Sequence, residues 1–219
     1  MNAPEHPWRG IDLGVYERHM SDARVGQLQQ LRTITGDQLF DHPATTVGFL
    51  GVAGGNGLDL IGPAVTTVYG YDINPDYLAA CEDRYRDKLG ERLHVIEATI
   101  DRALQIAPVD LLIANLIVEY VGASEFAAFI AANADGIGVL SCVIQRNEAA
   151  SFVSTSDVAS AFDGLASVAS DVDAGGLAKA LANVGWLEQA RWIYSLPNGK
   201  TLIRQDFVRQ AAQAVANRG

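Results

Sequence analysis

The sequence has few of the residues that mark disulfide-rich, metal-binding or nucleic-acid-binding proteins. Only two cysteines occur, Cys81 and Cys142. They fall in stretches patterned as a helix and a strand, which favours two small buried hydrophobes over a disulfide or a metal pair. Lysine and arginine form no cluster, and the formal net charge is −10. Proteins that follow a phosphate backbone normally carry a basic patch, so we expect no nucleic-acid partner.

Long hydrophobic runs are also missing. No stretch approaches the roughly 20 apolar residues of a membrane span. The first eight residues are polar and include Pro4 and Pro7, unlike a signal peptide. We therefore expect a soluble, cytoplasmic protein with no membrane partner. The 219 residues suit one domain, and 49% of them are hydrophobic, enough for a full core.

Short apolar runs alternate with helical patterns along most of the chain. The spacing predicts helices over 55–61, 75–89, 124–132 and 174–184, with Asn74 and Ser124 as caps and Pro75 in a first turn. Strands are predicted over 46–51, 67–73, 93–98, 109–117, 138–145, 186–196 and 200–209. This alternation predicts a mostly parallel sheet with helices on both faces.

The last two predicted strands are joined by Pro197-Asn198-Gly199, a strong signal for an antiparallel hairpin. Apolar positions at helical spacing in residues 14–34 predict one or two helices before the first strand. The predicted fold class is α/β: a Rossmann-like doubly wound, mostly parallel seven-stranded sheet, with a C-terminal antiparallel hairpin and extra N-terminal helices.

We divide the chain into three parts. Residues 1–45 form an N-terminal helical segment that covers the site, residues 46–209 form the main domain, and residues 210–219 form a tail. Within the main domain, residues 146–172 are rich in Ser, Ala and Asp and lose strong periodicity. We interpret them as an insertion on the substrate side.

The most informative stretch is a glycine-rich loop, Gly51-Val52-Ala53-Gly54-Gly55-Asn56-Gly57, which follows a predicted strand. Such a loop brings backbone N–H groups to a ligand, although it could also be a plain tight turn. About 20 residues later, Asp72 ends the next predicted strand, where an acid can accept hydrogen bonds from ribose hydroxyls. Asp72 could instead cap the following helix, but Asn74 is better placed for that role.

These residues resemble the class I S-adenosylmethionine-dependent methyltransferases. GVAGGNG resembles that family's first motif, YDINPDYL its acidic second-strand motif, and Glu97-Ala98-Thr99 its segment beside the adenine. The sequence departs from the family at Phe49, where an acid is frequent, and at Ala53, which replaces the second glycine. The resemblance implies S-adenosylmethionine as cofactor, no metal, and cofactor contacts from Gly51, Ala53, Gly55, Asn56, Asp72, Ile73, Ala98, Thr99 and Asn115.

Four further residues are candidates for the acceptor side. His19 has the ordinary pKa of a base near neutral pH, but it could simply be an exposed histidine. Glu119 could orient a substrate or cap a helix, and Tyr16 could be a packing residue. Gln145 ends the predicted fifth strand. We list His19, Glu119, Tyr16 and Gln145 as catalytic candidates.

The predicted function is methyl transfer to an oxygen, nitrogen or carbon of a small molecule, mainly by proximity and alignment. Asn115-Leu116-Ile117-Val118 lacks the Pro-Pro-aromatic pattern of enzymes that methylate nucleobases. Two alternatives remain open: a nicotinamide-dependent oxidoreductase, and a non-catalytic nucleoside-binding protein of the same fold. The predicted strand edges and apolar helices are also compatible with a homodimer.

Overall fold

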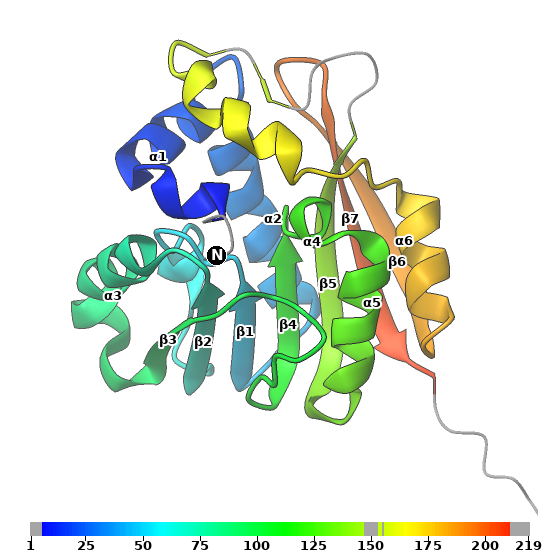
Figure 1. The fold of residues 1–219 in the computed structure, drawn as a ribbon. Helices are drawn as coiled ribbons and strands as arrows, with labels where there is room; N and C mark the ends of the chain where they lie inside the picture. The colour runs from blue at the N-terminus through cyan, green and yellow to red at the C-terminus, as the bar shows by residue number, and fades with distance from the viewer. Residues whose placement is uncertain (1–5, 147–152, 155, 211–219) are drawn as a thin grey trace, which may run out of the picture.

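A seven-stranded sheet forms the centre of the molecule in the computed structural model, which describes residues 6–146, 153–154 and 156–210 (Figure 1). The strands are β1 Thr46–Leu50, β2 Thr67–Asp72, β3 Leu93–Glu97, β4 Val109–Asn115, β5 Ile137–Arg146, β6 Trp186–Ser195 and β7 Thr201–Arg209. Their order is β3-β2-β1-β4-β5-β7-β6. Strand β7 runs antiparallel to both of its neighbours, and the other pairs are parallel. The predicted fold class is confirmed.

Helices cover both faces of the sheet because alternate residues of each buried strand face opposite layers. In β4, Leu112 packs with α5 and α6, whereas Leu111 packs with α3. The α-helices are α1 Leu13–Ser21, α2 Gln27–Asp41, α3 Pro75–Leu89, α4 Val118–Val121, α5 Ala123–Ala132 and α6 Ala174–Ala182. The 3-10 helices are η1 Pro7–Gly10, η2 Leu58–Leu60, η3 Gly90–Arg92, η4 Ala134–Gly136 and η5 Ala159–Ser167.

Several local predictions hold. Asn74 caps α3, since its side chain accepts hydrogen bonds from the backbone N–H groups of Asp76 at 3.0 Å and Tyr77 at 3.3 Å. Pro75 occupies the first turn of that helix. Cys81 and Cys142 are both buried free thiols, which confirms their interpretation as small hydrophobes.

Two local predictions are wrong. No α-helix forms over residues 55–61; turns and the short η2 take its place, because Gly55 and Gly57 adopt φ of +85° and +92°, outside the helical region. Ser124 does not cap the next helix, since α5 already begins at Ala123 and Gly122 holds the cap position without a side-chain hydrogen bond.

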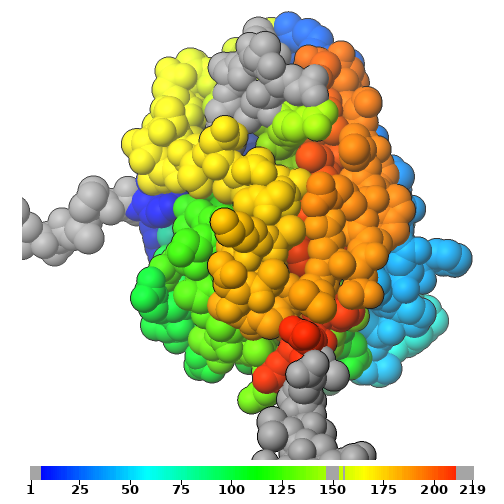
Figure 2. Space-filling model, turned by 90° about the vertical axis from the view of Figure 1, so that its right-hand side faces the viewer, coloured from blue at the N-terminus to red at the C-terminus, as the bar shows by residue number. Residues whose placement is uncertain are grey.

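Three segments form a layer over the carboxyl ends of the central strands, which we call the cap: η1, α1 and η5 (Figure 1). Figure 2 shows η5 (yellow) and α6 (orange-yellow) at the surface of the molecule. Of the predicted insertion 146–172, η5 lies in the described part, whereas residues 147–152 and 155 lie outside it, as does the predicted tail from residue 211 onwards.

The cap is fastened to the sheet by charged and polar contacts. Arg84 of α3 pairs with Glu17 of α1 at 2.7 Å and donates to the Gly54 carbonyl at 2.8 Å. Asn74 Nδ2 donates to the Trp8 carbonyl at 2.9 Å.

Within the described residues, no helix has the length and apolar character needed to cross a bilayer.

Candidate functional site

A cavity of about 340 Å³ lies between the carboxyl ends of the parallel strands and the cap. All four predicted catalytic residues line it: His19, Glu119, Tyr16 and Gln145. Most of the predicted cofactor-side residues line it too: Gly51, Ala53, Asp72, Ile73, Ala98, Thr99 and Asn115. These predicted residues thus meet at the carboxyl ends of the parallel strands, the edge at which α/β sheets bind ligands.

The glycine-rich loop is held against the end of β2 by backbone contacts. The N–H of Gly51 donates to the Tyr71 carbonyl at 2.8 Å, and the N–H of Ala53 donates to Oδ2 of Asp72 at 2.9 Å. Ala53 adopts φ of +47°, an uncommon conformation for a residue with a side chain. The loop and the acid singled out in the sequence are therefore one connected unit.

Two predicted cofactor-side residues lie away from this cavity. Gly55 faces α3, where an added Cβ would come 2.5 Å from Cε2 of Tyr85 and 2.9 Å from Sγ of Cys81. Asn56 lines a small adjoining pocket, which shares Gly51, Ala53 and Asn115 with the cavity, and its side-chain N–H donates to the Leu28 carbonyl at 3.0 Å. The structure therefore gives Gly55 a packing role and gives Asn56 a role in holding α2.

Asp72 is buried at the rim of β2. Its two carboxylate oxygens accept hydrogen bonds from the backbone N–H groups of Asn74 and Ala53, both at 2.9 Å. Burial raises the pKa of Asp72, and these backbone hydrogen bonds oppose that rise. Because Asn74 caps α3, the alternative that Asp72 caps this helix is not what the structure shows.

Aromatic rings from the cap and from the sheet side form one wall of the cavity. The Trp8 ring stands edge-on to Tyr16 and to Tyr120, with centroids 5.7 and 5.1 Å apart, and Tyr16 stacks on Tyr77 at 6.0 Å. Sequence reasoning missed Trp8 and Tyr77, since their spacing gave no signal of a shared wall. We call Trp8, Tyr16 and Tyr120 the aromatic wall.

Glu119 is the most strongly perturbed acid in the cavity lining. It is 2% exposed, and Oε1 accepts a hydrogen bond from the backbone N–H of Gln145 at 2.6 Å. Oε2 is buried and has no hydrogen-bond partner among the described residues. Burial raises the pKa of this carboxyl from 4.5 to about 7, despite the opposing hydrogen bond from Gln145. Glu119 therefore bridges α4 to β5 and caps no helix.

The Glu119→Gln substitution gives a stability prediction. A raised carboxyl pKa means that the folded state holds a proton that the unfolded state loses, so stability falls as pH rises from 4.5 towards 7. The amide cannot ionise. Between about pH 4 and about pH 8, we expect the variant to gain about 3 kcal/mol of unfolding free energy relative to the wild type. Urea unfolding at both pH values measures this, and a constant difference between the two proteins would contradict it.

His19 is buried rather than exposed, with a relative exposure of 5%. Its Nδ1 lies 2.7 Å from the Ser156 hydroxyl, and its ring packs on Phe162 at a centroid distance of 4.5 Å. Burial, aided by the nearby charge of Lys200, lowers the His19 pKa below 6.5, with Asp22 acting in the opposite direction. The imidazole is therefore largely neutral near pH 7 and able to accept a proton.

Two side-chain amide pairs join α2 to the ends of the strands. Gln27 donates to the side-chain oxygen of Gln145. Gln38 and Asn115 exchange hydrogen bonds of 3.0 and 3.1 Å between their amide groups. Sequence reasoning missed Gln27 and Gln38, although they lie on one face of the helix at helical spacing.

In the described ranges 6–146, 153–154 and 156–210, no group of three or more His, Cys, Asp or Glu side chains is arranged to hold a metal ion.

Comparisons with known proteins give no match to a family model and none to a curated protein. Among solved structures, a magnesium protoporphyrin IX methyltransferase from Synechocystis PCC 6803 with bound SAM has a TM-score of 0.70 and 16% identity, over 96% of this chain and 100% of that chain. The N-methyltransferase NodS from Bradyrhizobium japonicum WM9 with S-adenosylhomocysteine has a TM-score of 0.63 and 13% identity, over 90% and 97%.

The chain has a Rossmann-like methyltransferase fold. Another similar structure is the [4+2]-cyclase SpnF, with a TM-score of 0.64 and 12% identity, over 84% of this chain and 82% of that chain. Structures similar to this methyltransferase fold thus include one described by a reaction other than methyl transfer. The fold alone does not fix the reaction, so the function has to be argued from the cavity.

Proposed function

We propose that this protein binds S-adenosylmethionine in the cavity and transfers its methyl group to a small molecule. One observation carries the proposal: a single cavity runs from Ala53 and Asp72 at the ends of β1 and β2 to His19, Glu119 and Gln145 beneath the cap. A cofactor at one end and an acceptor at the other would therefore share one enclosed space. Such proximity is most of what methyl transfer requires of a protein.

The residues at the β1–β2 end fit the cofactor. Asp72 presents a carboxylate to hydroxyl donors, and the Gly51–Ala53 backbone borders the adjoining space. Ile73, Ala98 and Thr99 supply a mostly apolar border with one hydroxyl, suited to a purine ring. When bound, S-adenosylmethionine supplies a methyl group already activated on a positively charged sulfur.

At the other end, the chain's own residues enclose and orient the acceptor. The aromatic wall excludes water, Glu119 and Gln145 offer polar atoms, and neutral His19 is able to take up a proton. The catalytic roles of His19, Glu119, Tyr16 and Gln145 remain our proposal.

The segment after the glycine-rich loop argues against the alternative that the protein is a nicotinamide-dependent oxidoreductase. Dinucleotide-binding proteins place the pyrophosphate at the N-terminus of a helix that directly follows the glycine-rich loop. Here, turns and the three-residue η2 follow the loop. The non-catalytic nucleoside-binding alternative differs from our proposal in turnover alone, so an assay separates the two.

The experiment is a methyl-transfer assay with methyl-labelled S-adenosylmethionine and a panel of small organic amines, alcohols and phenols. We expect at least one labelled product, formed together with an equal amount of S-adenosylhomocysteine. Asp72→Asn should strongly reduce both at S-adenosylmethionine concentrations that half-saturate the wild type. Tight cofactor binding without any labelled product would favour the non-catalytic alternative.

Three further predictions belong to this proposal: the cytoplasmic location, the division into residues 1–45, 46–209 and 210–219, and a homodimer. Phe40 and Ile193 are exposed apolar side chains of the kind a dimer would cover, with relative exposures of 84% and 62%. Light scattering coupled to gel filtration measures the oligomeric state.

A further inference from the structure

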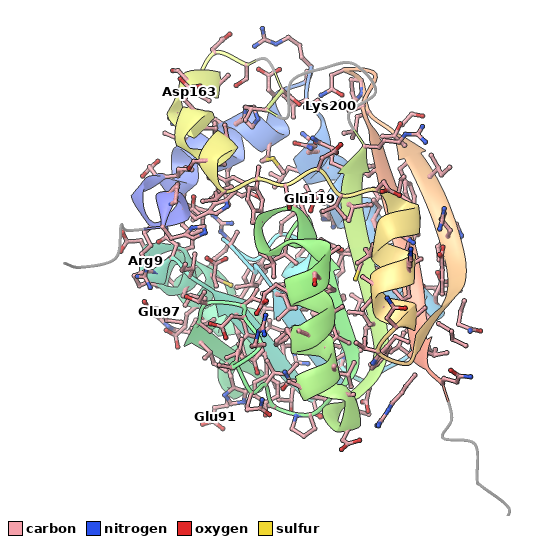
Figure 3. The ribbon with its side chains drawn as sticks, turned by 45° about the vertical axis from the view of Figure 1, so that its right-hand side comes forward. Arg9, Glu91, Glu97, Glu119, Asp163 and Lys200 are labelled. Carbon is pink, nitrogen blue, oxygen red and sulfur yellow. The ribbon has the colours of Figure 1, made fainter. Side chains whose placement is uncertain are left out.

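The carboxyl group of Glu119 has one oxygen, Oε2, without a partner among the described residues, which a purely structural residue does not need. Its Oε1 links β5 to α4 through the Gln145 N–H, a role that a glutamine side chain would fill equally well. Its Oε2 is buried and has no partner among the described residues, and Glu119 is one of the residues that line the cavity (Figure 3). Buried polar atoms in native proteins are nearly always paired, so an unpaired carboxylate oxygen on a residue that lines a cavity indicates a missing hydrogen-bond partner.

The charged side chains that line the cavity indicate which kind of ligand would supply that partner. Among the described lining residues, the acids are Asp72, Glu119 and Glu125, and none is a lysine or an arginine. Asp72 lies at the cofactor end, and Glu125 is already paired with Arg102 through a hydrogen bond of 2.8 Å. Among the described lining residues, Glu119 is thus the acid left for the acceptor.

The surroundings of Glu119 are otherwise apolar and aromatic. The aromatic wall, Phe162 and Leu165 line the same cavity. Aromatic faces attract cations as well as apolar rings, and a ligand with an apolar body would bury itself against them. The site thus combines the carboxyl group of Glu119 with apolar and aromatic side chains that can pack against the body of a ligand.

We propose that the acceptor molecule is an organic amine with an apolar, ring-containing body, whose nitrogen donates a hydrogen bond to Oε2 of Glu119. The inference rests on the proposed function, because it names the substrate class of that same cavity. No lysine or arginine among the described lining residues is placed to pair with a carboxylate or phosphate acceptor, whereas a protonated amine beside Glu119 would favour the ionised form of its carboxyl and so lower its raised pKa.

Binding of matched probes tests the proposal. Isothermal titration calorimetry, with S-adenosylhomocysteine saturating, compares 2-phenylethylamine, 2-phenylethanol and 3-phenylpropanoate, and then the same three head groups on an indole ring. We expect the amine to bind most tightly in each set. Glu119→Gln should weaken amine binding by about 20-fold or more, since a hydrogen bond to a charged group is lost. The alcohols should change little.

Glu125→Gln is the matched control, because it makes the same chemical change at another lining acid whose carboxylate is already paired; amine affinity should change less than about threefold. An alcohol or carboxylate that binds as tightly as the amine would overturn the inference, as would unchanged amine affinity in Glu119→Gln or no binding by any probe. If S-adenosylhomocysteine itself fails to bind the wild type, the proposed function fails instead.

Discussion

The Asp72→Asn variant should bind S-adenosylhomocysteine about 100-fold more weakly than the wild type, as measured by calorimetry. Two hydrogen bonds from ribose hydroxyls to a carboxylate contribute about 1.5–3 kcal/mol each, and an amide can replace only part of that interaction. The free energy of unfolding should also fall, by about 1–3 kcal/mol, because the amide oxygen can accept only one of the backbone hydrogen bonds from Asn74 and Ala53, and the amide nitrogen can accept neither.

Asp87→Asn provides the control for this experiment. Asp87 is an exposed acid on α3 with the same charge and side chain, so the substitution matches the chemistry without touching the cavity. Its affinity should equal that of the wild type. If Asp72→Asn also keeps wild-type affinity within about threefold, Asp72 does not hold the ribose and the cofactor end is misplaced.

The second large effect is expected at Gly55. In Gly55→Ala, the new Cβ would lie 2.5 Å from the Tyr85 ring and 2.9 Å from Sγ of Cys81, in a backbone with φ of +85°. Strain at a positive φ and overpacking each cost about 1–3 kcal/mol. We expect the free energy of unfolding to fall by about 3 kcal/mol or more, measured by urea denaturation.

Gly185→Ala separates the two causes. Gly185 has almost the same φ, +84°, but a Cβ there meets nothing within 4 Å. That variant should lose only about 1 kcal/mol, the cost of the backbone strain. Equal losses in the two variants would mean that Gly55 is not packed against α3 as the structure shows.

The sequence predicted the sheet well because strand identity depends on local patterns. Most of the parallel strands are apolar runs bounded by turn residues, Pro197-Asn198-Gly199 marks the hairpin between β6 and β7, and Asn74-Pro75 marks the start of α3. The closeness of the glycine-rich loop to Asp72 was also predictable, since the loop follows β1, Asp72 ends β2, and parallel strands end at one edge of the sheet.

The acceptor end was less predictable because its contacts join distant parts of the chain. Gln27 and Gln145 are 118 residues apart, and the Ser156 contact of His19 spans 137. The burial that raises the pKa of Glu119 arises from tertiary packing, which a local sequence pattern does not show. Sequence reasoning could name Glu119 and His19 as polar candidates but could not give their protonation states.

The error over residues 55–61 has a related cause. Apolar positions at Leu58 and Ile61 resemble a helical face, and both are buried. The glycines before them adopt positive φ to bring the loop against α3 and Thr35, which prevents a helix from starting. Tertiary packing overrode the local pattern here.

The central claim is tested most directly by calorimetric titration of the purified protein with S-adenosylhomocysteine, with NAD and NADP titrated in parallel. We predict a micromolar Kd for the thioether, corresponding to about −8 kcal/mol, and at least about 100-fold weaker binding of either nicotinamide nucleotide. No binding of the thioether, or tighter binding of NAD or NADP, would contradict the assignment of this cavity to S-adenosylmethionine.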